Sequence, residues 1–334
     1  MSESPIASLY TYFNESAQIL QKSLSVTYLE AVAMAGENLF NSRVVQNGIS
    51  EPDEKQLDQL SGKVDLDKYS REEIRKAYQL AILKGMKENV QANHQMTPDT
   101  IGLFMGYFIA KFTSGRRALS ILDPAVGTGN LLTTILNQLD EKEITAYGAD
   151  VDDILIRLAY TGANLLCHDI ELFTQDSLTR LFIDPVDIVV CDLPVGYYPN
   201  DAGAKAYQLK ADEGHSYAHH LFIEQSLRYT RPGGYLFFLI PNHLFESKEA
   251  PKLHQFLKEE AIIQAILQLP LTLFKNEQSA KSILVLQKKS EGIQAPEQVL
   301  LASLPSLSNQ QAVQSVMLKI DAWCRENIET DRNE

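Results

Sequence analysis

The feature that most constrains the fold is the stretch 119–132, Leu-Ser-Ile-Leu-Asp-Pro-Ala-Val-Gly-Thr-Gly-Asn-Leu-Leu. An apolar run ends in Asp123, a turn with Gly127 and Gly129 follows, and an amphipathic run begins at Asn130. This order predicts a strand, a tight loop and the first turn of a helix. Glycines let a backbone turn sharply and approach a ligand closely, and a helix N-terminus attracts anions. With Asp123 as an acceptor, the loop suits a ligand that carries both a carboxylate and an ammonium group.

The loop differs from the common nucleotide-binding motifs. Leu132 occupies the third glycine position of G-x-G-x-x-G, and no G-K-[ST] ending of a triphosphate loop is present. Residues 143–150 predict a second strand ending in Asp150, about twenty residues past the loop, where ribose hydroxyls are usually held. A ribose acceptor together with an amino-acid site indicates S-adenosylmethionine (SAM). The alternative is an ordinary strand-turn-helix without a ligand.

Composition sets the class of protein. The chain has 334 residues, of which 45% are hydrophobic and 22% charged, as in globular proteins with two domains. No apolar run approaches the roughly 20 residues needed to cross a bilayer, and the first residues lack signal-peptide features. Three distant cysteines (Cys167, Cys191 and Cys324) predict neither a disulfide nor a C-x-x-C metal site, so a cytoplasmic location without a metal is expected. The net charge of −13 predicts weak binding to DNA unless a partner helps.

Residues 1–93 predict a helical N-terminal domain. Ser70 and Glu73 form a capping box, and an apolar face follows at helical spacing: Ile74, Ala77, Tyr78, Ala81 and Ile82. These helices are interpreted as a bundle that packs on the next domain, with a surface for a protein partner as the alternative. Residues 94–290 are expected to form the SAM-binding catalytic domain, and residues 291–334 a C-terminal extension closed by a helix over 313–326.

Two further positions leave alternatives open. Thr97 can cap a helix that begins at Pro98, and the start of that helix either closes over the ligand or is plainly structural. Residues 171–177 predict a short strand ending in Asp176 and Ser177. Asp176 either accepts the adenine amino group of the ligand or caps a helix that follows.

The second chemical motif lies at 186–199. A continuous apolar strand, as expected for one buried on both faces, ends in Asp192 and is followed by Leu-Pro-Val-Gly-Tyr-Tyr-Pro. A carboxylate at the end of a strand, a turn stiffened by Pro194 and the aromatic residues Tyr197 and Tyr198 occupy the place where α/β sheets bind substrates. Residues 200–216 predict a functional lid or a disordered loop.

The remaining catalytic-domain residues predict a helix and the end of the sheet. His220 and Glu224 share a helix face and could bind a metal, although a solvated or capping role is favoured because no third ligand is present. Residues 231–234 predict a tight turn. The strands expected at 261–269 and 282–287 have no helix between them, so they predict an antiparallel hairpin at the end of the sheet.

Taken in order, these motifs resemble the class I SAM-dependent methyltransferases. The segments that match the family pattern, in order, are Thr97-Pro98, residues 121–129, Asp192 to Pro194, residues 231–234 with Pro241-Asn242, and Phe274-Lys275-Asn276 followed by 282–286. Among them the chain resembles adenine-specific DNA methyltransferases, particularly modification subunits of type I restriction systems, and most closely the small stand-alone YtxK-like proteins of bacteria. The implied fold is α/β, with a Rossmann-like seven-stranded sheet, mostly parallel with an antiparallel terminal hairpin, preceded by the helical domain.

The resemblance also implies roles for particular residues. It assigns cofactor contacts to a set in and around the strand ends: Thr97, Asp123, Ala125, Gly127, Gly129, Asn130, Asp150, Val151, Asp176, Ser177 and Asp192. It also implies that Asp192 and Pro194 face the amine that accepts the methyl group. In the family, an Asn, Asp or Ser is followed by two prolines and an aromatic residue; here Leu193 and Val195 replace the first proline and the aromatic. Tyr197 or Tyr198 is the hypothesised substitute for the aromatic that stacks on a flipped base.

Three functions follow from this pattern. The first is methyl transfer to the amino group of adenine in DNA. The second is methyl transfer to RNA or to a protein amide, and the third is SAM binding by a regulatory or scaffold protein without turnover. Asp123 and Asp192 favour an enzyme, whereas Val195 and the negative net charge favour the second and third functions.

Overall fold

The structure is a computed structural model that describes residues 4–88, 96–139, 141–306 and 309–329. These residues form two compact units. Unit 1 comprises Met1–Gly106, Val126–Asp140 and Gly148–Gln175, and unit 2 comprises Tyr107–Ala125, Glu141–Tyr147 and Asp176–Glu334. The boundary predicted between residues 93 and 94 lies outside the described residues.

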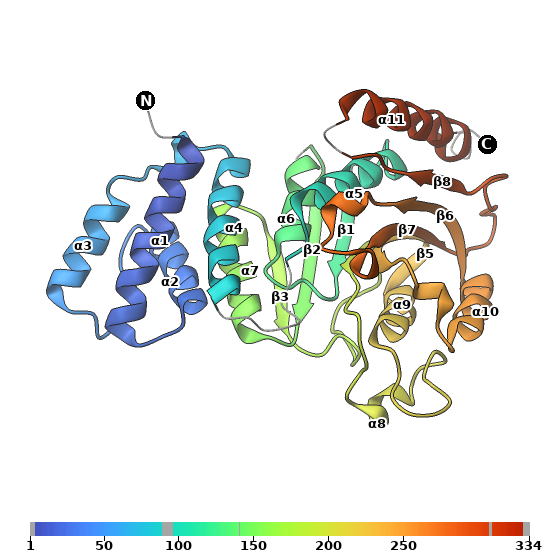
Figure 1. Ribbon diagram of the computed structural model, residues 1–334, viewed down its shortest axis with the longest axis horizontal. Coiled ribbons are helices and arrows are strands. Elements are labelled where there is room, and N and C mark those ends of the chain that lie inside the picture. The colour runs from blue at the N-terminus through green and yellow to red at the C-terminus, as the bar shows by residue number, and fades with distance from the viewer. Residues whose placement is uncertain (1–3, 89–95, 140, 307–308, 330–334) are drawn as a thin grey trace. The chain divides into compact units, whose positions relative to one another are not determined.

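Unit 1 begins with the predicted N-terminal helices, α1 (Pro5–Leu24), α2 (Tyr28–Asn41), α3 (Glu51–Ser61) and α4 (Arg71–Glu88), coloured blue to cyan in Figure 1. Local signals set their starts. Ser70 Oγ accepts a hydrogen bond from Glu73 N, and a Glu73 carboxylate oxygen accepts one from Ser70 N, so the predicted capping box is confirmed. A second capping box, Thr27 with Glu30, starts α2.

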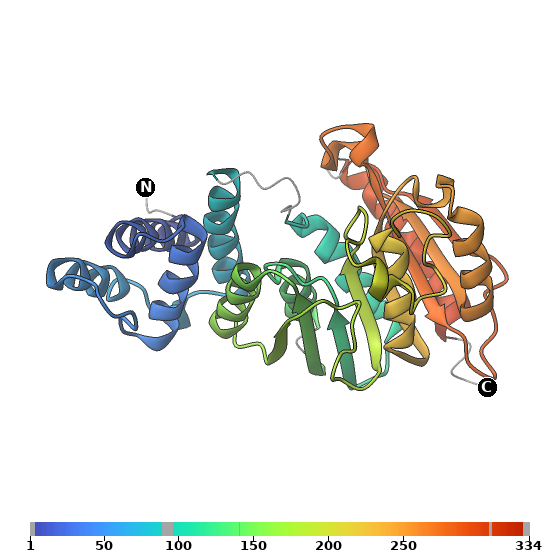
Figure 2. The same ribbon diagram turned by 90° about the horizontal axis from the view of Figure 1, so that it is seen from below.

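Helices from the middle of the chain also belong to unit 1. These are α6 (Asn130–Gln138) and α7 (Asp153–Leu165), and the unit also holds β3 (Ile170–Thr174). One apolar cluster joins buried residues of α1 to α4 to Leu155, Leu158 and Leu165 of α7. In both views α4 lies beside α6 and α7 (Figures 1 and 2). The N-terminal helices therefore share one compact unit with α6 and α7.

Eight strands of the described chain form one sheet in the order β3-β2-β1-β4-β5-β7-β6-β8. The bounds of the others are β1 (Ala118–Asp123), β2 (Glu143–Asp150), β4 (Val186–Asp192), β5 (Thr230–Pro241), β6 (Ala261–Gln268), β7 (Lys281–Lys288) and β8 (Leu300–Ser303). Strand β4 pairs in parallel with β1 and β5, and β7 runs antiparallel to β5 and β6. The predicted antiparallel hairpin is confirmed, but β8 rather than the hairpin lies at the end of the sheet.

Two expectations about the sheet are corrected. The sheet has eight strands rather than seven, because β8 of the C-terminal extension pairs in parallel with β6. The segment Arg231 to Gly234 lies within β5 and is not a turn. Val186 pairs with Thr230 and Ile188 with Tyr235, so the extra residues form a bulge, in which Gly233 takes a positive φ of 76°.

The remaining α-helices of the described chain are α5 (Asp99–Phe112), α8 (Asp201–Ala204), α9 (Ala218–Arg228), α10 (Ala250–Glu260) and α11 (Gln310–Cys324). In unit 2, the predicted closing helix α11 packs on the end of α5, where Trp323 contacts Phe112 and Asp321 pairs with Lys111 (Figure 1). Within the described ranges no helix combines the length and apolar character that crossing a membrane requires.

Of the solvated or capping role expected for His220 and Glu224, the solvated role is wrong. Both side chains are buried on α9, and the Glu224 carboxylate accepts hydrogen bonds from Gln208 N (3.0 Å) and Leu209 N (2.8 Å). Glu224 therefore anchors the 200–216 segment to α9. Burial lowers the pKa of His220 to about 4, which keeps this side chain neutral near pH 7.

Candidate active site

The glycine loop adopts the geometry expected from its sequence. Gly127 and Gly129 have φ values of 53° and 78°, in the left-handed region that favours glycine. A Cβ on Gly129 would lie 3.2 Å from the Ala159 Cβ of α7, so only glycine fits there without a shift, whereas the space around Gly127 is open. Helix α6 begins at the next residue, Asn130. The loop thus leaves room beside Gly127 for a ligand near a helix N-terminus.

Asp150 at the end of β2 holds this loop. One carboxylate oxygen accepts a hydrogen bond from Gly127 N (3.0 Å), and the other accepts one from Asp152 N (3.1 Å). Because a carboxylate offers about four lone-pair sites, Asp150 can accept ribose hydroxyls as well. The next side chain, Val151, is 70% exposed and offers an apolar surface for a flat ring. The residues of unit 1 therefore fit the nucleoside part of SAM.

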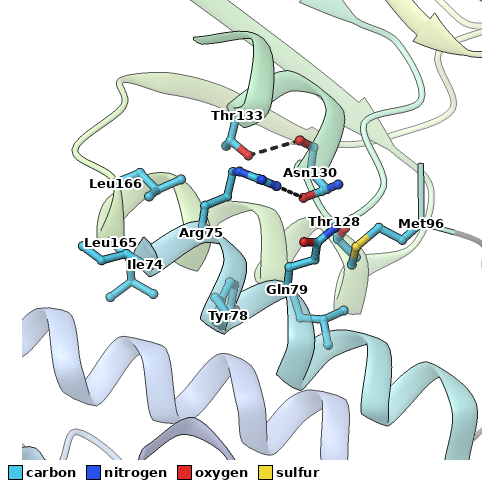
Figure 3. Close-up of a pocket in the computed structure, with 12 residues that line it drawn as sticks. Ile74, Arg75, Tyr78, Gln79, Met96, Thr128, Asn130, Thr133, Leu165 and Leu166 are labelled. Carbon is cyan, nitrogen blue, oxygen red and sulfur yellow. Dashed lines mark hydrogen bonds between the residues drawn. The ribbon is translucent and has the colours of Figure 1, made fainter. Parts of the chain in front are cut away.

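The side chain of Asn130 binds protein groups. It is buried, its Oδ1 accepts a hydrogen bond from the Arg75 guanidinium (2.7 Å), and its Nδ2 donates to Thr97 O (2.9 Å) and Asp99 Oδ1 (3.3 Å). Figure 3 shows Arg75 and Asn130 facing each other beside a small pocket also lined by Thr128 and Met96. Any contact of Asn130 with a ligand would therefore use its backbone. The expected helix after Thr97 begins at Asp99, one residue later than predicted.

Arg75 was missed by the sequence reasoning. A signal was available in the sequence. Arg75 stands three positions before Tyr78 and seven before Ile82, so helical spacing places this charged residue on the apolar side of α4.

Asp123, the first candidate of unit 2, is buried, and its Oδ1 accepts a hydrogen bond from Ala125 N (3.1 Å). A buried carboxylate is costly unless donors or cations surround it, so this position suits an ammonium group. The Ser177 hydroxyl oxygen is also buried and has no hydrogen-bond partner among the described residues. Such a group is a candidate for binding a polar atom of a ligand. Both observations fit SAM.

Asp176 is held by a tyrosine. Its Oδ1 accepts a hydrogen bond from Leu178 N (2.9 Å), and its Oδ2 accepts one from the Tyr198 hydroxyl (2.6 Å). Residues 177 and 178 form a turn, so of the two roles left open for Asp176 the helix cap is excluded. Burial, together with the bond to Asp176, raises the pKa of Tyr198 to about 12, so this hydroxyl stays a donor.

Asp192 ends β4, and its register partner on β5 is Leu239. The Lys281 ammonium, at the start of β7, donates to Asp192 Oδ1 (2.5 Å). The two residues that depart from the family motif behave differently: Leu193 is buried, whereas Val195 is exposed. Lys281 was missed because a residue 89 positions away reaches Asp192 only through the strand order β4-β5-β7.

The two tyrosines after this loop have different surroundings. Tyr198 is only 6% exposed and points its hydroxyl at Asp176. Tyr197 is 63% exposed and stacks on Tyr217, with ring centroids 5.2 Å apart and planes inclined by 17°. The backbones of Tyr197 and Tyr217 also form an antiparallel bridge. An aromatic surface therefore follows Asp192 along the chain, and Tyr197 rather than Tyr198 presents it.

Comparison with known proteins identifies the family. The model of the N-6 DNA methylase family matches residues 72–323. The chain belongs to this family. A second model, the YtxK N-terminal helical domain, matches residues 7–86, so the two matches share most of α4. SAM is the cofactor of these methyltransferases and hence of this chain.

Similarity to individual proteins supports this family assignment. The uncharacterized protein YtxK of Bacillus subtilis is 54% identical over 324 residues, which cover 97% of this chain and 98% of YtxK. A crystal structure from Listeria monocytogenes, of a proposed class I SAM-dependent methyltransferase, is 46% identical with a TM-score of 0.90, covering 96% of this chain and 99% of that one. A proposed type I restriction modification subunit from Vibrio vulnificus shares the fold at 16% identity, with a TM-score of 0.63 and coverages of 86% and 66%. The predicted family and fold class are confirmed.

Proposed function

We propose that this methyltransferase transfers a methyl group to the exocyclic amino group of adenine in DNA. The observation that carries the proposal is the loop after β4. It begins with a carboxylate, Asp192, paired with Lys281, and continues to an exposed stacked pair, Tyr197 and Tyr217. A carboxylate suits an amino group, and an exposed aromatic pair suits a flat base.

The cofactor contacts implied by the sequence remain part of the proposal. The backbone of Gly127, Gly129 and Asn130 would receive the carboxylate of SAM at the start of α6. Asp150 and Val151 would hold its ribose and adenine, and a second group would bind its remaining polar atoms: Thr97, Asp123, Ala125, Asp176 and Ser177. When bound, SAM supplies an electrophilic methyl group on a sulfonium.

The acceptor requires activation. The lone pair of an exocyclic amine is delocalised into the ring, which makes the nitrogen a weak nucleophile. In our proposal, the Asp192 carboxylate and a backbone carbonyl near Pro194 each accept a hydrogen bond from one of the two N–H groups of this amine. These contacts draw the lone pair out of conjugation, orient it, and stabilise the positive charge that grows on nitrogen during attack. The ion pair with Lys281 limits the rotation of the Asp192 side chain.

Tyr197 would replace the aromatic residue that the family carries where this chain has Val195. Tyr198 is the weaker candidate because its ring is buried and its hydroxyl is bonded to Asp176. We therefore propose that Tyr197 stacks on the base, whereas Tyr198 holds the carboxylate of Asp176 beside the cofactor.

A protein partner is the second part of the proposal. A net charge of −13 opposes strong binding to DNA phosphates. The Vibrio relative is a proposed subunit of a restriction enzyme, which suggests that a related chain acts within a complex. We propose that the N-terminal helical domain, taken as residues 1–93, offers the surface for such a partner.

The test is transfer of labelled methyl from SAM to purified DNA, RNA and protein. Asp192→Ala is the catalytic variant, and Asp212→Ala, an exposed acid of the same unit, is the matched control. Label in DNA that disappears only in Asp192→Ala supports the proposal. Label confined to RNA or protein moves the activity to another acceptor, and SAM binding without any transfer indicates a regulatory protein.

A further inference from the structure

The Arg75 guanidinium on α4 is a buried cation, with its side chain only 3% exposed. Each of its five N–H groups has an acceptor. Nε and one terminal nitrogen donate to Glu72 (2.8 and 2.7 Å), both terminal nitrogens donate to Asp99 (2.9 and 2.8 Å), and the last N–H donates to Asn130 Oδ1 (2.7 Å). An arginine with all donors used has a fixed position and orientation.

These acceptors join three parts of unit 1. Glu72 lies on α4 itself, Asp99 begins α5, and Asn130 begins α6 directly after Gly129. The Asn130 amide extends the network to the backbone of Thr97. A single side chain from the N-terminal helices therefore fixes both the end of the glycine loop and the Thr97 segment.

The charges within the network favour this arrangement. Burial alone would raise the pKa of Asp99, but the hydrogen bonds and charge of Arg75 hold it below the usual value. The pKa of Glu72 is lowered for the same reasons. Two ionised carboxylates therefore surround the guanidinium near neutral pH, and a neutral replacement would leave both without their counter-ion.

We propose that Arg75 is a positioning residue for the cofactor loop, so that the N-terminal helical domain is part of the SAM-binding apparatus. By fixing the first residue of α6, Arg75 sets the direction in which the backbone N–H groups at the helix start point. This inference rests on the cofactor contacts proposed above for residues 127–130.

The same unit contains a second arginine–carboxylate pair between these parts of the chain. Arg157 of α7 donates to both oxygens of Glu37 of α2 (2.7 and 2.8 Å). This pair also links the N-terminal helices to a catalytic-domain helix, yet none of its recorded hydrogen bonds involves the glycine loop. Arg157 is more exposed than Arg75 (36% against 3% for the side chain), so it controls for the loss of an ion pair between these helices, whereas ordering of residues 126–131 depends on Arg75 alone.

The experiment compares Arg75→Lys with Arg157→Lys in the full chain. Lysine keeps the charge but lacks the fork that bridges several acceptors. We expect Arg75→Lys to weaken SAM binding about tenfold by calorimetry, equivalent to about 1.4 kcal/mol. In the absence of SAM, backbone hydrogen exchange at residues 126–131 should also be faster in Arg75→Lys than in the parent chain. Arg157→Lys should leave both within about twofold, because the hydrogen bonds of Arg157 reach Glu37 and not residues 126–131.

Asp99→Asn, which keeps the shape of the acceptor, is the second variant if Arg75→Lys folds poorly, and it should show the same two effects. Unchanged exchange at residues 126–131 in Arg75→Lys and Asp99→Asn would overturn the proposal, as would equal losses in Arg157→Lys. If the parent chain binds no SAM, the proposed cofactor contacts fail, while the exchange data still decide whether Arg75 orders the loop.

Discussion

Replacing Tyr197 with alanine tests the proposed acceptor surface. The ring is 63% exposed and contacts Tyr217 by stacking at 5.2 Å. An aromatic pair contributes about 0.5–1.5 kcal/mol beyond buried area, and exposure reduces that further. The free energy of unfolding should therefore fall by no more than about 1 kcal/mol in Tyr197→Ala.

The effect on the acceptor should be larger. Stacking of a base on an aromatic side chain contributes about 1–3 kcal/mol. Converted to a ratio, this range predicts that kcat/KM for DNA falls by about 5-fold to about 150-fold. Tyr197→Phe keeps the ring and should stay within about twofold of the parent, since only the hydroxyl is lost.

The assay is labelled-methyl transfer to an oligonucleotide at limiting concentration, with SAM binding measured in parallel. Tyr160→Ala, another exposed tyrosine (55%) on α7, is the matched control. The reasoning is refuted if Tyr197→Ala retains the parent kcat/KM. It is also refuted if Tyr160→Ala loses as much.

Three further predictions concern the cofactor side and pH. Gly129→Ala should destabilise the chain by about 1–2 kcal/mol in denaturant unfolding, because alanine disfavours a φ of 78°; an unchanged midpoint would contradict the loop geometry. Tyr198→Phe, which removes a hydrogen bond to a carboxylate, should cost about 1.5–3 kcal/mol of stability and weaken SAM binding in calorimetry, while leaving KM for DNA unchanged. Burial lowers the pKa of His219 to about 3 and of His220 to about 4. The unfolded chain therefore takes up protons first as pH falls below about 6.5, and each histidine should cost about 2 kcal/mol of stability between pH 7 and 5; His220→Leu should make this loss shallower.

Local patterns made much of the fold predictable. The glycine loop, the strand ending in Asp150 and the apolar strand ending in Asp192 each depend on residues adjacent in sequence. The hairpin followed from two apolar runs without a helix between them. Strand β8 was missed because four residues carry too weak a pattern, and the bulge near Gly233 resembles a turn in sequence.

The parts of the site that escaped prediction depend on tertiary contacts. Arg75 reaches Asn130 across 55 positions, and Lys281 reaches Asp192 across 89. Tyr197 and Tyr198 are adjacent and chemically identical, so only the fold distinguishes the exposed ring from the buried one. Sequence motifs therefore indicate the chemistry, and the fold determines which side chains support it.

The central claim is that Asp192 directs a methyl group from SAM to an adenine amino nitrogen. The most direct measurement is mass spectrometry of nucleosides from DNA incubated with the protein and SAM carrying a deuterated methyl group. The account predicts deuterated N6-methyladenine with the parent chain and at least about 100-fold less with Asp192→Ala, since that variant loses the acceptor that orients the amine and stabilises its growing positive charge. An unlabelled adenine pool, or equal labelling by Asp192→Ala, would contradict it.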